Sequence, residues 1–158
     1  MTILIKNGRL INPSENLDKV MDIFVEDGII KEKAESIEKQ ADTVIDAAGC
    51  YVMPGLIDLH VHFRDPGLTY KEDIETGSKA AAKGGFTTVC CMPNTKPVVD
   101  NVETVKYIIE KGEKTGLTNV LPVGAVTKNM AGVEITDVEE LKKAGICAIS
   151  EDGKSVMN

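Results

Sequence analysis

At 158 residues the chain is long enough for one domain with a substantial buried core. Its composition, 42% hydrophobic and 27% charged, is typical of a globular protein, and no apolar run approaches the roughly 18 residues of a membrane span. The net charge of −7 argues against nucleic acid as a partner, because phosphate binding needs a basic face. It does not exclude a small anionic substrate.

The cysteines indicate a reducing compartment. The four of them form no Cys-x-x-Cys pair, and the adjacent Cys90 and Cys91 lie in an apolar run, where we interpret them as small core hydrophobes. The N-terminus lacks the basic, apolar and small-residue layout of a secretory signal. We therefore expect a cytoplasmic protein that has no membrane partner.

Residues 1–51 predict a small β-rich subdomain. Short apolar runs alternate with residue pairs that favour tight turns. The predicted segments are two strands around a turn at Asn7-Gly8, two around Asp27-Gly28, and a third strand and turn over Val44–Gly49.

From Tyr51 onward the pattern changes to alternating strands and helices, which is typical of a parallel sheet. Two capping boxes predict helix starts, one at Thr69 with Glu72 and one at Thr136 with Glu139. The expected strands cover 52–62, 86–92, 119–126 and 146–150. The expected helices cover 70–83, the segment from a cap at Asp100 or Asn101 to Gly116, and the segment from Thr136 to Gly145.

His60 and His62 are the only histidines in the chain, and they stand at the polar end of the first of these strands. Residues two apart on a strand point to the same face, so both imidazoles aim at one spot. The simpler alternative is a strand that carries two half-buried, hydrogen-bonded histidines. We favour a shared metal ion, because the apolar run has Pro-Gly pairs on both sides.

The histidine pair belongs to a longer series of motifs: Pro54–His62, His62–Gly67, Lys71–Asp73, Gly84–Val89 and Met92–Thr95. The first of them resembles the first-strand signature of the amidohydrolase superfamily, which are metal-dependent hydrolases on a (β/α)8 barrel. The series as a whole is similar to the dihydroorotases. This resemblance implies an enzyme with one or two Zn²⁺ ions that interconverts N-carbamoyl-L-aspartate and (S)-dihydroorotate.

The resemblance also sets the expected domains. A complete barrel needs about 250 residues, whereas residues 52–158 suffice for roughly four βα units. We expect them to form strands one to four, and residues 1–51 to form half of a composite sandwich. In the family, a general acid/base Asp from the eighth strand and further histidines complete the site. We expect those groups beyond Asn158 and expect the chain alone to be inactive.

Active sites of such barrels lie at the carboxyl ends of the strands, where the sequence places His60, His62 and Asp152. The resemblance makes the two histidines ligands of one zinc ion and gives Asp152 a bridging role toward a second. Two imidazoles and a carboxylate are also a plausible zinc set on chemical grounds. The alternative for Asp152 is an ordinary Asp-Gly turn. By strand alternation, we expect its neighbour Glu151 to point the other way.

Arg64 lies two residues beyond His62, and a guanidinium pairs bidentately with a carboxylate. In the family this Arg and the residue matching Asn94 hold the substrate's carboxylate. We assign His62 to the substrate as well. The alternatives are an ion pair of Arg64 with Asp65 or Asp73, and a turn capped by Asn94.

Other functions stay open at this point. A sibling cyclic amidase, such as an allantoinase or dihydropyrimidinase, binds an uncharged ring where Arg64 lies, which argues against it. A non-catalytic scaffold, like the dihydroorotase-like subunits that serve aspartate carbamoyltransferase, would not need the intact histidines. Unpaired strand edges also predict that the chain self-associates or comes from a longer polypeptide.

Overall fold

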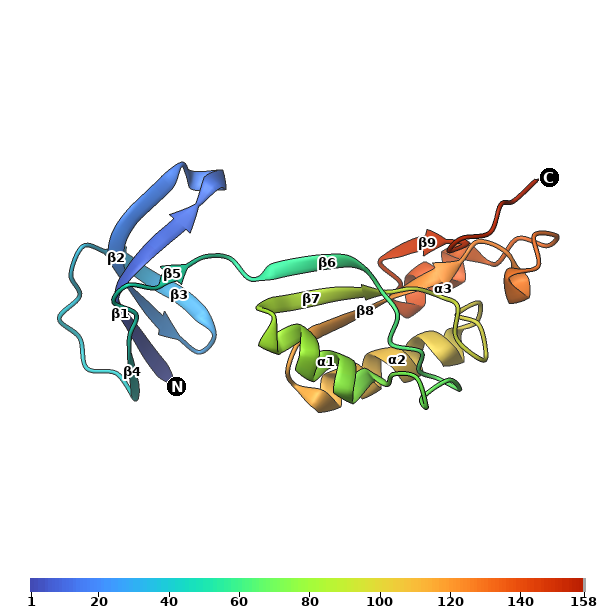
Figure 1. The fold of residues 1–158 in the computed structure, drawn as a ribbon, viewed down its shortest axis with the longest axis horizontal. Coiled ribbons are helices and arrows are strands. Elements are labelled where there is room, and N and C mark those ends of the chain that lie inside the picture. The colour runs from blue at the N-terminus through green and yellow to red at the C-terminus, as the bar shows by residue number, and fades with distance from the viewer. Residues whose placement is uncertain (158) are drawn as a thin grey trace. The chain divides into compact units, whose positions relative to one another are not determined.

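The computed structural model describes residues 1–157. They form two compact parts, Met1–Pro54 and a second part that begins at Gly55. Each part has a sheet of its own (Figure 1).

The first part is the expected β-rich segment. Its strands follow the order β3-β2-β1-β4, with β5 also paired to β1. The β1–β2 and β2–β3 pairs are antiparallel, whereas β4 and β5 run parallel to β1. Leu4, Phe24 and Ile37 are its buried apolar core. The elements are β1 (Thr2–Asn12), η1 (Pro13–Glu15), β2 (Leu17–Glu26), β3 (Ile29–Ala34), β4 (Thr43–Asp46) and β5 (Tyr51–Val52).

One of the predicted turns in this part is correct and one is wrong. Asp27 and Gly28 have φ of 49° and 76° and connect β2 to β3 as a hairpin. The turn expected at Asn7-Gly8 is a bulge instead, where the β1–β2 register shifts and β1 continues. The buried carboxylate of Asp22 stabilises this bulge, because it accepts the Asn7 N–H at 2.9 Å.

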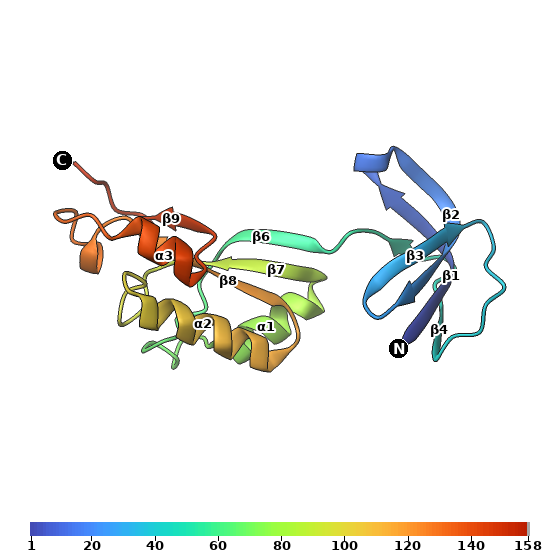
Figure 2. The same cartoon turned by 180° about the vertical axis from the view of Figure 1, so that it is seen from behind.

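The second part confirms the expected βα alternation. Four parallel strands lie in the order β6-β7-β8-β9. Both Figure 1 and Figure 2 show α1 and α2 side by side along one face of this sheet. Among the described residues, no helix combines the length and apolar character needed to cross a membrane. The elements are β6 (Leu56–Val61), α1 (Ile74–Lys83), β7 (Phe86–Cys91), α2 (Val102–Thr115), β8 (Asn119–Ala125), η2 (Lys128–Met130), α3 (Val138–Ala144) and β9 (Ala148–Ser150).

The two faces of the second sheet differ. Alternate residues of the strands pack against the helices, so that Val89 and Cys91 face the main core whereas Cys90 and Met92 face the other way. We call this other side the inner face. The main core comprises Phe63, Ile74, Val89, Cys91, Val99, Val105, Ile108, Val120 and Leu141.

The single strand expected over 52–62 is wrong. Tyr51 and Val52 form β5 and pair with β1 of the first part, and the second sheet begins only at Leu56. Pro54 has no N–H to donate to a sheet ladder, so the chain leaves one sheet before it enters the other. β6 then ends at Val61.

Two helix starts also differ from the prediction. α1 begins at Ile74, and Asp73 caps it in place of Thr69, accepting a first-turn backbone N–H at 2.8 Å. α3 is likewise capped by Asp137 in place of Thr136. A carboxylate is both a good cap acceptor and a favourable charge at a helix N-terminus, which explains both shifts.

The remaining helix ends are as predicted. The side chain of Asn101 caps α2 by accepting the Thr104 N–H at 2.9 Å. Gly116 and Gly145, which follow α2 and α3, have left-handed φ of 60° and 117°. Glycine takes this conformation without the steric penalty of a Cβ atom.

Candidate metal centre

The end of β6 presents two imidazoles to one point. His60 lies next to last in β6, and His62 directly follows the strand. Their Nε2 atoms are 3.3 Å apart. The His60 side chain is 59% exposed and that of His62 is 32% exposed, so the point where they meet is open to solvent. The structure therefore brings the two rings together as their spacing of two residues predicts.

Asp152 reaches the same point from the end of β9, the strand at the opposite edge of the sheet. Its Oδ1 atom lies 3.1 Å from His60 Nε2, and its Oδ2 atom lies 3.9 Å from His62 Nδ1. The Asp152 N–H donates to Ser150 Oγ at 3.0 Å, which fixes the turn that follows the strand. Side chains from the two edges of a four-stranded sheet meet in this way only when the sheet curls, as it does in a barrel.

The spacing of these donors allows them to hold a metal ion. The ligand atoms of His60, His62 and Asp152 all lie within 4.8 Å of one another. Two nitrogens at about 2.0–2.1 Å from a tetrahedral zinc ion would be about 3.4 Å apart. The observed Nε2–Nε2 distance is 3.3 Å. Because imidazole nitrogen and carboxylate oxygen are also suitable donor types, this group could hold a metal ion.

Asn94, which follows β7, connects the other predicted residues. Its Oδ1 atom is 3.1 Å from His62 Nδ1 and accepts a hydrogen bond from Arg64 Nη1 at 3.3 Å. Its Nδ2 atom donates to Asp152 Oδ2. Because an amide oxygen faces Nδ1 of His62, we assign the ring proton to Nδ1. Nε2 then keeps the lone pair that a metal ion requires.

Arg64 faces Asn94 and has a left-handed φ of 56°. Among residues 1–157 the guanidinium forms no ion pair with either of the carboxylates considered from the sequence. Asp65 lies 2.6 Å from Lys111 instead, and Asp73 caps α1. The other N–H groups of Arg64 therefore remain suited to an anionic group from outside.

Sequence reasoning missed the residue that holds this loop in place. The Asp65 side chain is completely buried, and it accepts hydrogen bonds from Tyr107 Oη at 2.9 Å and from the Ile74 N–H at 3.3 Å. The hydrogen bond that Lys111 donates to Asp65 raises the pKa of Lys111, although burial lowers it. Tyr107 and Lys111 share one face of α2, but nothing in their spacing identifies a partner in the loop after β6.

Glu151 points away from the centre, as strand alternation predicts. It is buried, and its Oε2 atom accepts the N–H groups of Val126 and Thr127 at 3.1 Å each. Its carboxylate thus holds the segment after β8 and does not reach the histidines.

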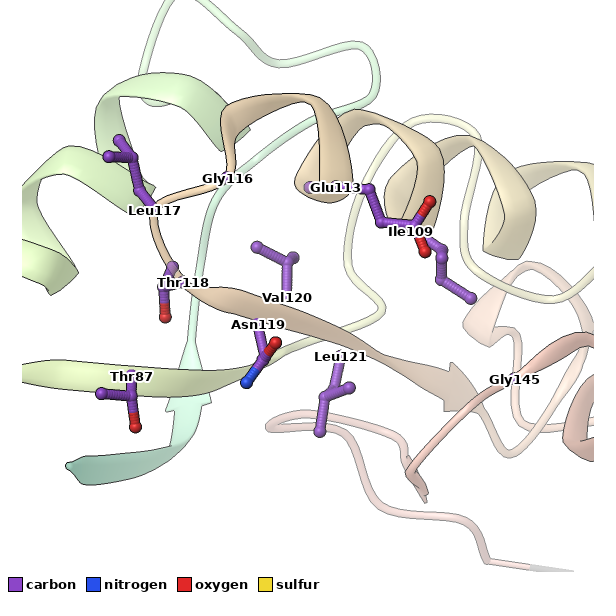
Figure 3. Close-up of a pocket in the computed structure, with 11 residues that line it drawn as sticks. Thr87, Ile109, Glu113, Gly116, Leu117, Thr118, Asn119, Val120, Leu121 and Gly145 are labelled. Atoms are coloured by element: carbon purple, nitrogen blue, oxygen red, sulfur yellow. The ribbon is translucent and has the colours of Figure 1, made fainter. Parts of the chain in front are cut away.

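The cavity in Figure 3 lies at the opposite, amino-terminal end of the strands. It has a volume of about 540 Å³, and its lining includes Thr87 and Asn119 near the starts of β7 and β8 and Glu113 near the end of α2. A second cavity of about 530 Å³ lies on the inner face and includes His60. Because sites of β/α barrels form at the carboxyl ends of the strands, the first cavity is not part of the candidate centre.

Comparison with known proteins gives sequence relatives along the whole chain. A family model described as Dihydro-orotase-like matches residues 49–158. Dihydroorotases from Pelobacter propionicus and Geotalea daltonii are 51% and 54% identical over 159 residues, which is 100% of this chain. The dihydroorotase of Geobacter sulfurreducens is 54% identical over 157 residues, or 99% of the chain. The chain spans only 37–38% of the length of these relatives.

Solved structures give the same fold. An L-hydantoinase (dihydropyrimidinase) from Arthrobacter aurescens matches with a TM-score of 0.76 at 28% identity, covering 93% of this chain and 32% of that one. A D-hydantoinase (dihydropyrimidinase) from Thermus sp. matches with a TM-score of 0.68 at 33% identity, covering 89% and 30%. The expected fold, the first four βα units of a (β/α)8 barrel after a β-rich segment, is confirmed.

Proposed function

The chain belongs to the dihydroorotase-like family, and from this premise we propose that it forms part of a zinc-dependent dihydroorotase. Such an enzyme is a cyclic amidohydrolase of pyrimidine biosynthesis that interconverts N-carbamoyl-L-aspartate and (S)-dihydroorotate. One observation carries the proposal: His60, His62 and Asp152 meet at one rim of the sheet, with Arg64 and Asn94 beside them.

In this proposal His60, His62 and Asp152 hold zinc, as one ion or two. The donor types and their spacing support this choice. When bound, the metal supplies a Lewis acid that polarises an amide carbonyl and lowers the pKa of water. Asn94 keeps His62 in the tautomer whose Nε2 can act as a ligand.

Arg64, Asn94 and His62 bind the substrate in this proposal. A guanidinium offers paired N–H groups to a carboxylate, and Asn94 lies within hydrogen-bonding distance of both Arg64 and His62. A carboxylate held by Arg64 is thereby placed next to the metal ligands, with the rest of a small ring directed toward them.

The proposed enzyme needs further catalytic groups that this sequence does not contain. We propose that the general acid/base Asp and further histidine ligands come from other residues of a longer polypeptide, and that the 158-residue chain alone binds metal without turnover. We also propose that residues 1–51 are one half of a composite sandwich, that the chain self-associates through its unpaired strand edges, and that it acts in the cytoplasm on a small anionic substrate.

Of the two alternatives, only the first has specific support. The structural similarity to hydantoinases favours a sibling cyclic amidase, but Arg64 beside Asn94 suits an acidic substrate better than a neutral ring. A non-catalytic scaffold for aspartate carbamoyltransferase is the other. It requires neither the meeting of His60 with Asp152 nor a metal ion.

Zinc binding by the purified chain tests the centre. We expect His60→Ala, His62→Ala and Asp152→Asn each to weaken zinc binding by at least about tenfold in a competition titration. Glu139→Gln is the matched control, because Glu139 is exposed on α3, where it forms an ion pair with Lys143, and it is not one of the proposed ligands. A wild-type chain that takes up no zinc, or variants that bind it as the control does, would refute the centre.

Substrate choice tests the reaction. In a longer polypeptide that contains this sequence and is active, we expect dihydroorotate to be hydrolysed in preference to hydantoin and allantoin. Arg64→Met should lower kcat/KM for dihydroorotate and leave any activity on neutral rings unchanged. Equal loss on all three rings would contradict the role of Arg64 in binding the acid.

A further inference from the structure

The loop after β6 holds Arg64 in a backbone conformation that needs support. Its φ of 56° lies in the left-handed region, which is unfavourable for a residue with a Cβ atom and persists only where neighbouring contacts hold it. The Arg64 carbonyl accepts the Leu68 N–H at 2.9 Å and closes a turn. This hydrogen bond lies within the loop, so it does not fix where the loop stands relative to the helices and strands.

The first support from outside the loop is α2, which holds the residue after Arg64. The Asp65 side chain is completely buried; Tyr107 Oη donates to its Oδ1 atom at 2.9 Å, and Lys111 Nζ lies 2.6 Å from its Oδ2 atom. Lys111 Nζ also donates to Tyr107 Oη at 3.2 Å, so each of the three side chains contacts the other two. Because Tyr107 and Lys111 are four residues apart on one helix face, a single turn of α2 fixes this carboxylate.

The second support is the segment after β7 that carries Asn94. The Lys96 N–H donates to the Pro66 carbonyl at 3.0 Å. A Cβ atom at Gly67 would lie 1.8 Å from the Lys96 carbonyl oxygen, so the two segments approach backbone to backbone and leave no room for a side chain. This contact places the loop beside Asn94, whose Oδ1 atom accepts from Arg64 Nη1 at 3.3 Å.

We propose that Tyr107 and Lys111 are positioning residues for the substrate-binding arginine. Through Asp65 they hold the Arg64 backbone in the left-handed conformation from which its guanidinium reaches Asn94. Neither residue touches the substrate in this proposal. The inference rests on the proposed function, in which Arg64 binds the carboxylate of a small acid.

These two residues separate positioning from folding. They belong to α2, which packs against α1 and α3, and they do not line the cavity of the inner face. Tyr107 and Lys111 are both partly exposed, so their polar atoms can be removed with little loss of packing. Asp65 is completely buried, so its replacement affects the stability of the whole second part.

Steady-state kinetics of an active, longer polypeptide that contains this sequence test the proposal. We expect Tyr107→Phe and Lys111→Met each to raise KM for dihydroorotate by about threefold or more and to change kcat little, because a contact made equally in the ground and transition states changes KM alone. Tyr51→Phe is the matched control, since it makes the same change in β5 of the first part and should match the wild type. Circular dichroism at the assay temperature verifies that each variant is folded.

A double variant distinguishes positioning from a general structural effect. In an Arg64→Met background, Tyr107→Phe should leave KM unchanged, because no guanidinium remains to be positioned. A further rise of KM in that background, or a Tyr107→Phe enzyme with the KM of the wild type, overturns the inference and leaves the proposed function standing. A wild type that does not hydrolyse dihydroorotate, or an Arg64→Met enzyme with unchanged KM, overturns both.

Discussion

Replacing Asp65 by Ala should destabilise the second part of the chain by about 2–3 kcal/mol. The buried Asp65 carboxylate accepts hydrogen bonds from the Ile74 N–H and the Tyr107 hydroxyl, and it forms an ion pair with Lys111. It joins the loop that carries Arg64 to the first turn of α1 and to two side chains of α2.

The size of the effect follows from what each partner loses. The Ile74 N–H is buried and would be left unsatisfied, which costs about 1–3 kcal/mol. Lys111 and Tyr107 are 36% and 41% exposed, so water can replace much of what Asp65 provides to them. The loss should therefore fall short of the roughly 3–5 kcal/mol expected when a fully buried ion pair is broken.

Urea unfolding followed by the helical far-UV circular dichroism signal measures this loss, because α1, α2 and α3 all lie in the second part. Glu75→Ala is the matched control, since it removes an exposed ion pair with Lys79 and should change stability by less than about 0.5 kcal/mol. Combining Asp65→Ala with Lys111→Met should cost less than the sum of the two single changes. A loss from Asp65→Ala no larger than that of the control would refute the reasoning.

Three further changes have predictable results. Gly77→Ala should destabilise α1 by about 1–3 kcal/mol despite alanine's better helix propensity, because the new Cβ would lie 2.4 Å from the ring of Phe63, and thermal unfolding measures the balance. Burial would raise the pKa of Asp22, but two backbone N–H groups and a lysine hold it below its ordinary value. Its contribution to stability is therefore present above about pH 4 and lost as the pH falls through the lower folded-state pKa, so Asp22→Asn should flatten the acid-unfolding curve of the first part. Asn101→Ala removes the α2 cap and should cost about 1 kcal/mol in urea unfolding, whereas an unchanged midpoint would show that water replaces the cap.

The βα alternation and the shared face of the two histidines could be predicted from local patterns, whereas the role of Asp152 was predicted from the resemblance to the dihydroorotases. The spacing of His60 and His62 fixes a shared face on any strand, and Asp152 follows a buried strand of the same parallel sheet. Parallel strands bring their carboxyl ends to one edge of the sheet. β6 and β9 are the two outermost strands, however, so Asp152 meets the histidines only because the sheet also curls.

The errors arose where distant contacts decide the local structure. Thr69 and Glu72 have the sequence of a capping box, but α1 starts later, at the point where the Ile74 N–H meets the buried carboxylate of Asp65. Asn7-Gly8 has the composition of a hairpin turn, but Asp22 of the neighbouring strand accepts the Asn7 N–H and stabilises a bulge. Neither partner can be identified by spacing along the chain.

The amide of Asn94 has a consequence for how the two halves of the centre respond to each other. Its oxygen accepts from Arg64 and orients the ring of His62, while its nitrogen donates to Asp152. In the proposed function, a carboxylate that binds the Arg64 guanidinium would compete with the Asn94 oxygen. It would thereby change the hydrogen bonding of His62 and, through the Asn94 nitrogen, that of Asp152. If both bind as proposed, we expect binding of the acid and of the metal ion to be thermodynamically linked, each changing the affinity for the other by the same factor.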